Sequence, residues 1–122
     1  MSLTDGNGSR TSTEGTPVIG PATFGELVAD RTATGAITLT DQSRNIQRID
    51  PDGSHRDVSF AASAEKRGSY FRIINSAGGA ENLVVKNAAG STLATLNQNE
   101  QGEFWHSGSA WIVLCVTTIA LS

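Results

Sequence analysis

The chain is poor in cysteine and in aromatic residues. Among its 122 residues there is one cysteine, Cys115, so an intramolecular disulfide and a CxxC pair of metal ligands are both excluded. Because Cys115 lies in an apolar run, we expect a buried, unreactive thiol. With four Phe, two Trp and one Tyr, the core of a single domain is thin, which favours stabilisation by a second copy of the chain.

The chain also lacks a basic tract. Nine Lys and Arg residues are outnumbered by twelve Asp and Glu residues, which gives a net charge of -3, and the Arg residues alternate with acidic ones. Phosphate binding requires a clustered basic face, so nucleic acid is not an expected partner.

Long apolar runs are absent as well. The longest, residues 110–116, is far shorter than a membrane span, and the N-terminal sequence MSLTDGNGSRTSTEG has no apolar segment like that of a signal peptide. We therefore expect a soluble protein that is made in a cytoplasm and has no membrane partner. A GxGxxG motif, a nucleophile elbow and a P-loop are also missing from the sequence.

Residues 1–33 are predicted to form an extended N-terminal arm. Residues 1–16 are almost free of apolar side chains. The short segment that follows contains several apolar residues, and in it Thr23 and Glu26 fit the cap of a helical turn. An arm of this kind is typical of a segment that docks on another protein. The expected docking residues are Val18, Ile19, Phe24, Leu27 and Val28.

Residues 34–122 are predicted to form a β domain. Apolar residues alternate in short runs separated by turn residues, with Ile37 and Leu39, Val58 and Phe60, and Phe71 and Ile73 pointing inward. Residues 45–50 are out of phase for a flat strand, which suggests a bulge or a twist, and PDGS at 51–54 fits a type I or II turn. Hairpins are expected through residues 88–91 and through residues 107–109. The expected fold is all-β, a small antiparallel sandwich, barrel or prism-like knob of about eight short strands.

The last strand is apolar on both faces. Strict alternation places Trp111, Val113, Cys115 and Thr117 on one face and Ile112, Leu114, Val116 and Thr118 on the other. A small antiparallel sheet usually leaves one face to water, so both sides of this strand should be covered. We predict that Trp111, Ile112, Leu114 and Val116 lie in the core or in an interface of a homo-oligomer.

The segment EFWHSGSAWIVL offers an alternative use of the two tryptophans. Trp105 and Trp111 flank a turn and could form a stacking platform for a sugar, yet few polar groups stand near them to fix hydroxyls, so a core or interface role is favoured. His55 and His106 form no spaced metal motif, and no cofactor or metal is expected. Asp50 and Asp52 flank Pro51 in a turn, where hydrogen bonds from side chain to backbone explain the two carboxylates.

Three stretches of the β region resemble a module of tailed-phage virions. They read ITLTDQSRNIQRIDPDGSHRDVSF, FRIINSAGGAENLVVKNAAGSTLATL and GSAWIVL, and together they cover about residues 36–114. Such modules are similar to those of head decoration proteins, head fibres and tail fibres, which are commonly trimers. The shared positions are turn and core positions, so no catalytic residue carries over.

The resemblance implies a structural role in the virion. One short arm with one knob fits a head decoration (cement) protein that binds the major capsid protein on the outer surface of the assembled head as a homotrimer. The first alternative is a receptor- or glycan-binding module of a fibre or tail tip, which would use the loops at 76–81 and 97–102. The second is a hydrolytic enzyme that would use Asp50, Asp52 or Glu103.

Overall fold

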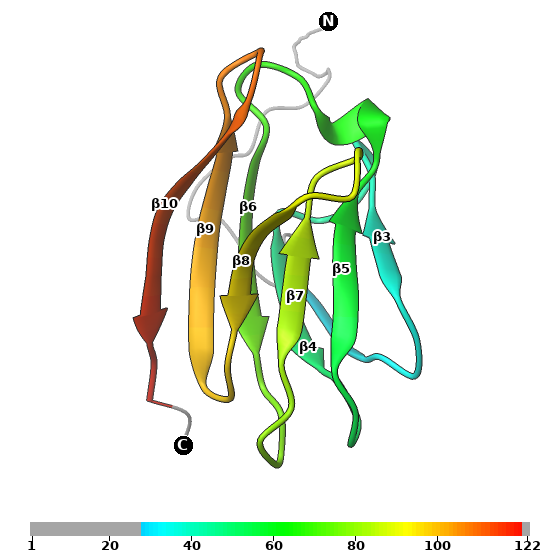
Figure 1. The fold of residues 1–122 in the computed structure, drawn as a ribbon, viewed down its shortest axis with the longest axis vertical. Coiled ribbons are helices and arrows are strands. Elements are labelled where there is room, and N and C mark those ends of the chain that lie inside the picture. The colour runs from blue at the N-terminus through cyan, green and yellow to red at the C-terminus, as the bar shows by residue number, and fades with distance from the viewer. Residues whose placement is uncertain (1–27, 121–122) are drawn as a thin grey trace, which may run out of the picture.

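Two β-sheets packed face to face make up the fold (Figure 1). The computed structural model describes residues 28–120, in which nine strands and one short 3-10 helix, η2 (Ala62–Ala64), are formed. The five-stranded sheet has the order β10 (Trp111–Thr118), β9 (Glu100–His106), β6 (Tyr70–Asn75), β4 (Ile46–Asp50) and β2 (Val28–Thr32). The four-stranded sheet has the order β3 (Ile37–Leu39), β5 (Arg56–Phe60), β7 (Leu83–Lys86) and β8 (Thr92–Leu96). The expected all-β architecture is confirmed, and of the expected sandwich, barrel or prism the structure forms a sandwich of two sheets.

The six strands from β2 to β7 form a coil that passes back and forth from one sheet to the other. Successive strands from β2 to β7 alternate between the sheets, so that neighbours within a sheet run parallel: β2 with β4, β4 with β6, β3 with β5, and β5 with β7. The antiparallel expectation was therefore wrong for this half of the domain. A short turn between two strands is equally compatible with a hairpin and with a crossing to the opposite sheet, and here the crossing occurs.

The last three strands close the coil by antiparallel pairing. β8 pairs with β7, and β9 lies between β6 and β10, antiparallel to both. Both predicted hairpins are confirmed, since residues 87–91 join β7 to β8 and residues 107–110 join β9 to β10.

The core lies between the sheets and follows the alternation in the sequence. The predicted inward pairs are all buried, and Phe60 contacts Phe71 and Phe104 at ring-centroid distances of 5.1 and 5.7 Å. Close aromatic packing of this kind stabilises a small core efficiently. The buried apolar cluster comprises Ala33, Ile37, Leu39, Ile49, Val58, Phe60, Ala64, Phe71, Ile73, Leu83, Val85, Leu96 and Phe104.

β4 differs from its expected form. It pairs regularly with β2 and β6, so the bulge, one of the two expected alternatives, is absent, because Gln47 and not Ile46 takes the inward position beside Ile49. The Gln47 amide reaches the carbonyl of Arg44 at 2.7 Å, which satisfies its donor within the sandwich. An inward glutamine in a strand is invisible to a search for alternating apolar residues.

The PDGS turn joins β4 to β5 across the sandwich. Asp52 and Gly53 both have positive φ, 57° and 80°, which is the signature of a type I′ turn and not of the expected type I or II. Pro51 is buried, and the carboxylate of Asp50 accepts a hydrogen bond from the Asp52 amide at 2.9 Å. Asp50 and Asp52 thus have a local structural role in the turn, as predicted.

The boundary between arm and domain lies earlier than residue 33. β2 pairs with β4 over all five of its residues, and Ala33 is buried in the core, with its amide bonded to the Asp50 carbonyl at 2.7 Å. Val28, expected in the docking arm, belongs to β2 and pairs with Ile46. Val18, Ile19, Phe24 and Leu27, and the capped turn at Thr23 and Glu26, lie outside the described residues.

Candidate functional site

Trp111 is half-buried and packs against the core. Its ring stacks on Phe60 with centroids 4.0 Å apart and an interplanar angle of 22°, and its indole N–H donates to a Glu65 carboxylate oxygen at 2.9 Å. His106 lies opposite Trp111 in the ladder, with its ring edge-on at 4.9 Å. The prediction for Trp111 was a core or interface position, and the structure shows its half-buried ring packed against the core.

The two tryptophans point to opposite faces of the sheet. Trp105 is opposite Ile112, one position along from the pair of Trp111 and His106, so its ring lies on the outer surface. A shared stacking platform is excluded, because Trp111 is occupied by its contact with Phe60. The hypothesis of a two-tryptophan sugar site was wrong.

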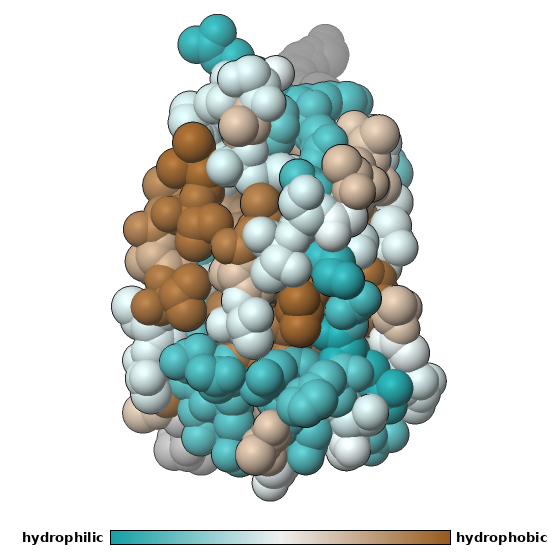
Figure 2. Space-filling view, in the orientation of Figure 1, coloured by the Kyte–Doolittle hydropathy of each residue, from teal (hydrophilic) through white to brown (hydrophobic). Residues whose placement is uncertain are grey.

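The β9–β10 hairpin carries the exposed apolar side chains of the domain. Over residues 28–120, the exposed large hydrophobic residues are Trp105 (37%), Ile112 (42%), Val113 (36%), Leu114 (53%) and Val116 (41%). Figure 2 shows a brown, hydrophobic surface on the left, where β10 runs in Figure 1. We call these five residues the β10 patch. A concentration of exposed apolar side chains at one site is typical of an interaction surface.

A β-bulge changes which residues of β10 share a face. Val113 is opposite Phe104, but Cys115 is opposite Glu103, so Leu114 is the extra residue. Cys115 therefore lies on the outer face, and Val116 lies opposite the inward Gly102. The predicted strict alternation was wrong beyond Val113, and Cys115 is half-buried instead of buried in the core.

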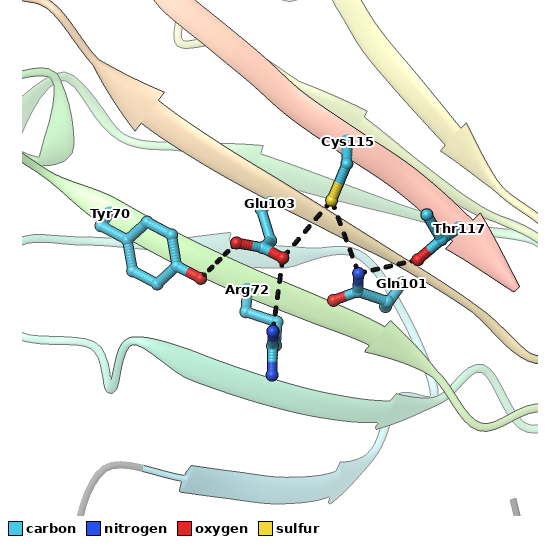
Figure 3. A network of polar contacts seen from close by, with 6 residues as sticks. All are labelled: Tyr70, Arg72, Gln101, Glu103, Cys115 and Thr117. Atoms are coloured by element: carbon cyan, nitrogen blue, oxygen red, sulfur yellow. Dashed lines mark hydrogen bonds and ion pairs between the residues drawn. The ribbon is translucent and has the colours of Figure 1, made fainter. Parts of the chain in front are cut away.

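The outer face of the five-stranded sheet holds a polar network centred on Glu103 (Figure 3). The Glu103 carboxylate accepts hydrogen bonds from the Tyr70 hydroxyl at 2.8 Å, from Arg72 Nη2 at 3.3 Å and from the Cys115 thiol at 3.3 Å. Gln101 Nε2 donates to Thr117 Oγ1 at 2.9 Å and lies 3.6 Å from the Cys115 sulfur. These side chains link β6, β9 and β10 across three strands.

The network shifts the pKa values of three of its members, Tyr70, Glu103 and Cys115. The hydrogen bonds from Tyr70 and Cys115, with the nearby Arg72 guanidinium, lower the pKa of Glu103 below its ordinary value. Burial and the hydrogen bond to Glu103 raise the pKa of Cys115 and likewise that of Tyr70. A carboxylate of lowered pKa is a weak base, and a thiol of raised pKa is a poor nucleophile. The arrangement therefore stabilises strand pairing and is poorly suited to acid–base or nucleophilic chemistry.

The remaining candidate residues are dispersed. Asp50 and Asp52 line a shallow depression of about 340 Å³ together with Gly53, Gly78, Gly79 and Glu81, and Glu103 is not among its lining residues. The structure thus does not bring together the three carboxylates of the enzyme hypothesis. Of the two loops of the receptor hypothesis, 76–81 borders this depression, whereas Gln101 and Gly102 of the other are buried in β9.

Both histidines accept a hydrogen bond from a backbone amide. His55 Nδ1 accepts from the Asn82 amide at 2.9 Å, and His106 Nδ1 accepts from the Gly108 amide at 3.0 Å. Within the part of the chain that the structure describes, no three His, Cys, Asp or Glu side chains are grouped as a metal site would require. No helix among these residues has the length and apolar character needed to cross a membrane.

Sequence reasoning missed the Glu103 network. The alternation that points Phe71 and Ile73 inward leaves Tyr70, Arg72 and Ile74 on the other face of the strand, as observed, but the strand that pairs beside them was unknown. Tyr70 pairs with Trp105 and Arg72 with Glu103 only because β6 and β9 meet across the sheet. The sequence signal that was available is the alternation of polar residues at 70, 72, 101 and 103.

Comparison of the chain with protein-family models, with curated proteins and with solved structures found no match. What is established is the class, a two-sheet all-β domain with a coiled parallel half and an antiparallel closing half.

Proposed function

We propose that the protein is a decoration protein of a tailed-phage head, which binds the outer surface of the assembled shell as a homotrimer and stabilises it. The β domain is the projecting knob, and the segment that precedes β2 contacts the major capsid protein. The protein acts as a structural component of the virion and not as an enzyme.

The observation that carries the proposal is the β10 patch. Five exposed apolar side chains gather on a domain with few large apolar residues, as expected of a chain that functions as an oligomer. The phage part of the proposal rests on the resemblance of residues 36–114 to virion modules. The knob supplies the subunit contacts, and Val18, Ile19, Phe24 and Leu27 supply those to the capsid protein.

Attachment through three arms would give tight binding from weak individual contacts. Each arm that orders on the capsid loses conformational entropy, which reduces the affinity of one arm alone. Joining three arms through one knob makes the second and third contacts intramolecular, so the assembled trimer binds far more tightly than one subunit.

The proposal is tested by co-sedimentation with heads. The full chain is mixed with expanded heads of the encoding phage that lack this protein, and with unexpanded heads as a control. We expect saturable binding to the expanded heads. The alternative role as a receptor- or glycan-binding tip module predicts no binding to either form of head and binding to host cells or to a glycan array.

A further inference from the structure

β10 is unusual among the edge strands of the two sheets. β2, β3, β8 and β10 are the edges in the described part of the chain, and β10 is the longest of them, with eight residues. β2 carries Asp30 and Arg31, β3 has only three residues, and β8 is uncharged like β10 but has only five residues. β10 has neither a charged residue nor a proline, although natural proteins commonly use both to prevent edge strands from associating.

The β10 patch wraps around this edge. Ile112 and Trp105 are opposite each other on the outer face, whereas Val113 and Val116 are opposite Phe104 and Gly102, which face the interior. The five-stranded sheet faces only four strands, and β8, the nearest strand of that smaller sheet, leaves these two valines more than one-third exposed. Both sides of one strand thus remain uncovered.

The charge of the chain points to a second copy as the cover. The chain carries a net charge of -3, yet no charged residue occurs from Ser107 to the end of β10. Like-charged molecules repel one another, and a neutral apolar surface is where two copies can approach with least repulsion. A partner recognised by its opposite charge would find no ion-pair partner on this strand.

The bulge determines how the copies meet. Extension of the sheet from one copy to the next needs a regular edge, and the extra residue at Leu114 bends β10 in its middle. The same bulge leaves Leu114 the most exposed of the five residues, at 53%. Side-chain packing around Leu114 is therefore favoured over continuous strand pairing.

We propose that copies of this chain associate through the β10 patch, by side-chain packing centred on Leu114 with Ile112 and Val116 beside it. This inference rests on the homo-oligomer of the proposed function and specifies its interface. It is independent of what the assembled protein binds.

The test is light scattering during size-exclusion chromatography of the full chain. The wild type should elute as an oligomer, and Leu114→Asp should elute with the monomer mass of 12.8 kDa and an unchanged circular dichroism spectrum. The control is Thr38→Asp, which adds the same charge at an exposed position of β3 and should leave the oligomer intact. A monomeric wild type, or a Leu114→Asp protein that stays oligomeric, would overturn the inference.

A milder variant guards against misfolding and tests the mode of packing. Leu114→Thr retains strand propensity, so an interface made by backbone pairing would tolerate it, whereas side-chain packing predicts a dissociation constant raised about tenfold or more. An unchanged constant would overturn the proposed packing.

Deletion of residues 1–27 should leave the oligomer intact. If the truncated chain were monomeric, the interface would lie in the N-terminal segment instead. A monomeric wild type that still bound heads would refute the proposed interface but not the proposed attachment to the capsid. An oligomeric wild type that did not bind heads would refute the attachment but not the interface.

Discussion

Trp111 and Phe60 are stacked with their ring centroids 4.0 Å apart, which joins the edge strand β10 of one sheet to β5 of the other. This contact anchors the start of β10, while the rest of the strand, apart from the half-buried Cys115, remains exposed. The same hairpin therefore contributes to the core at one residue and forms a candidate interface at the following ones.

Replacing Trp111 by alanine should be strongly destabilising. The substitution removes the stack on Phe60 and the hydrogen bond to Glu65 and leaves a cavity, so we expect a loss of about 3–5 kcal/mol in the free energy of unfolding. Chemical denaturation followed by circular dichroism measures it. Trp105→Ala is the matched control, because Trp105 is 37% exposed and should cost less. Equal losses for the two variants would contradict the assignment of Trp111 to the core.

The difference in stability between the wild type and the Tyr70→Phe variant should depend on pH. Tyr70 is the main cause of the lowered pKa of Glu103, so its loss should raise that pKa, as measured by NMR titration of the carboxyl carbon. A lowered folded-state pKa contributes stability above the unfolded carboxyl value, about 4.3, and this contribution is lost as pH falls through the folded value. The raised pKa of Tyr70 contributes below about 10 and is lost as pH rises through its folded value. The wild type should exceed the variant in stability between these limits, and a difference that grew under acid would contradict the network.

Gly102→Ala should destabilise the fold by overpacking. An added Cβ would lie 2.9 Å from the Phe104 ring and 3.0 Å from Leu96, both of which are fully buried. We expect a loss of about 1–3 kcal/mol in a thermal or denaturant melt. Gly35→Ala is the control, since a Cβ there meets nothing within 4 Å, and its effect should be near zero. A neutral Gly102→Ala variant would show that β9 and β8 pack less closely than described.

Two truncations should separate the arm from the domain. Deletion of residues 1–27 retains β2 and should leave the melting temperature almost unchanged. Deletion of residues 1–33 also removes β2 and the buried Ala33, which exposes the edge of β4, and should lower the melting temperature clearly. Equal melting temperatures for the two would mean that β2 contributes nothing to the stability of the domain.

The alternation of apolar residues was enough to predict most of the strands but not their connections, and β2 was assigned to the arm. The inward pairs at 37 and 39, 58 and 60, and 71 and 73 are buried as expected, because alternation is a property of each strand alone. The parallel coil was missed because a turn such as PDGS is local, whereas the sheet that the next strand joins depends on contacts distant in sequence. The Glu103 network was missed for the same reason, and the bulge at Leu114 because one extra residue leaves no mark in composition.

The proposed role in the phage head is tested most directly by the copy number of this protein in purified virions. Quantitative gel electrophoresis of intact particles gives the ratio of this chain to the major capsid protein. A decoration protein predicts a ratio fixed by the shell lattice, with as many trimers as there are equivalent attachment sites, and loss of the band from heads assembled with the Δ1–27 chain. A ratio as low as that of tail proteins, or the absence of the chain from purified particles, would contradict the proposal.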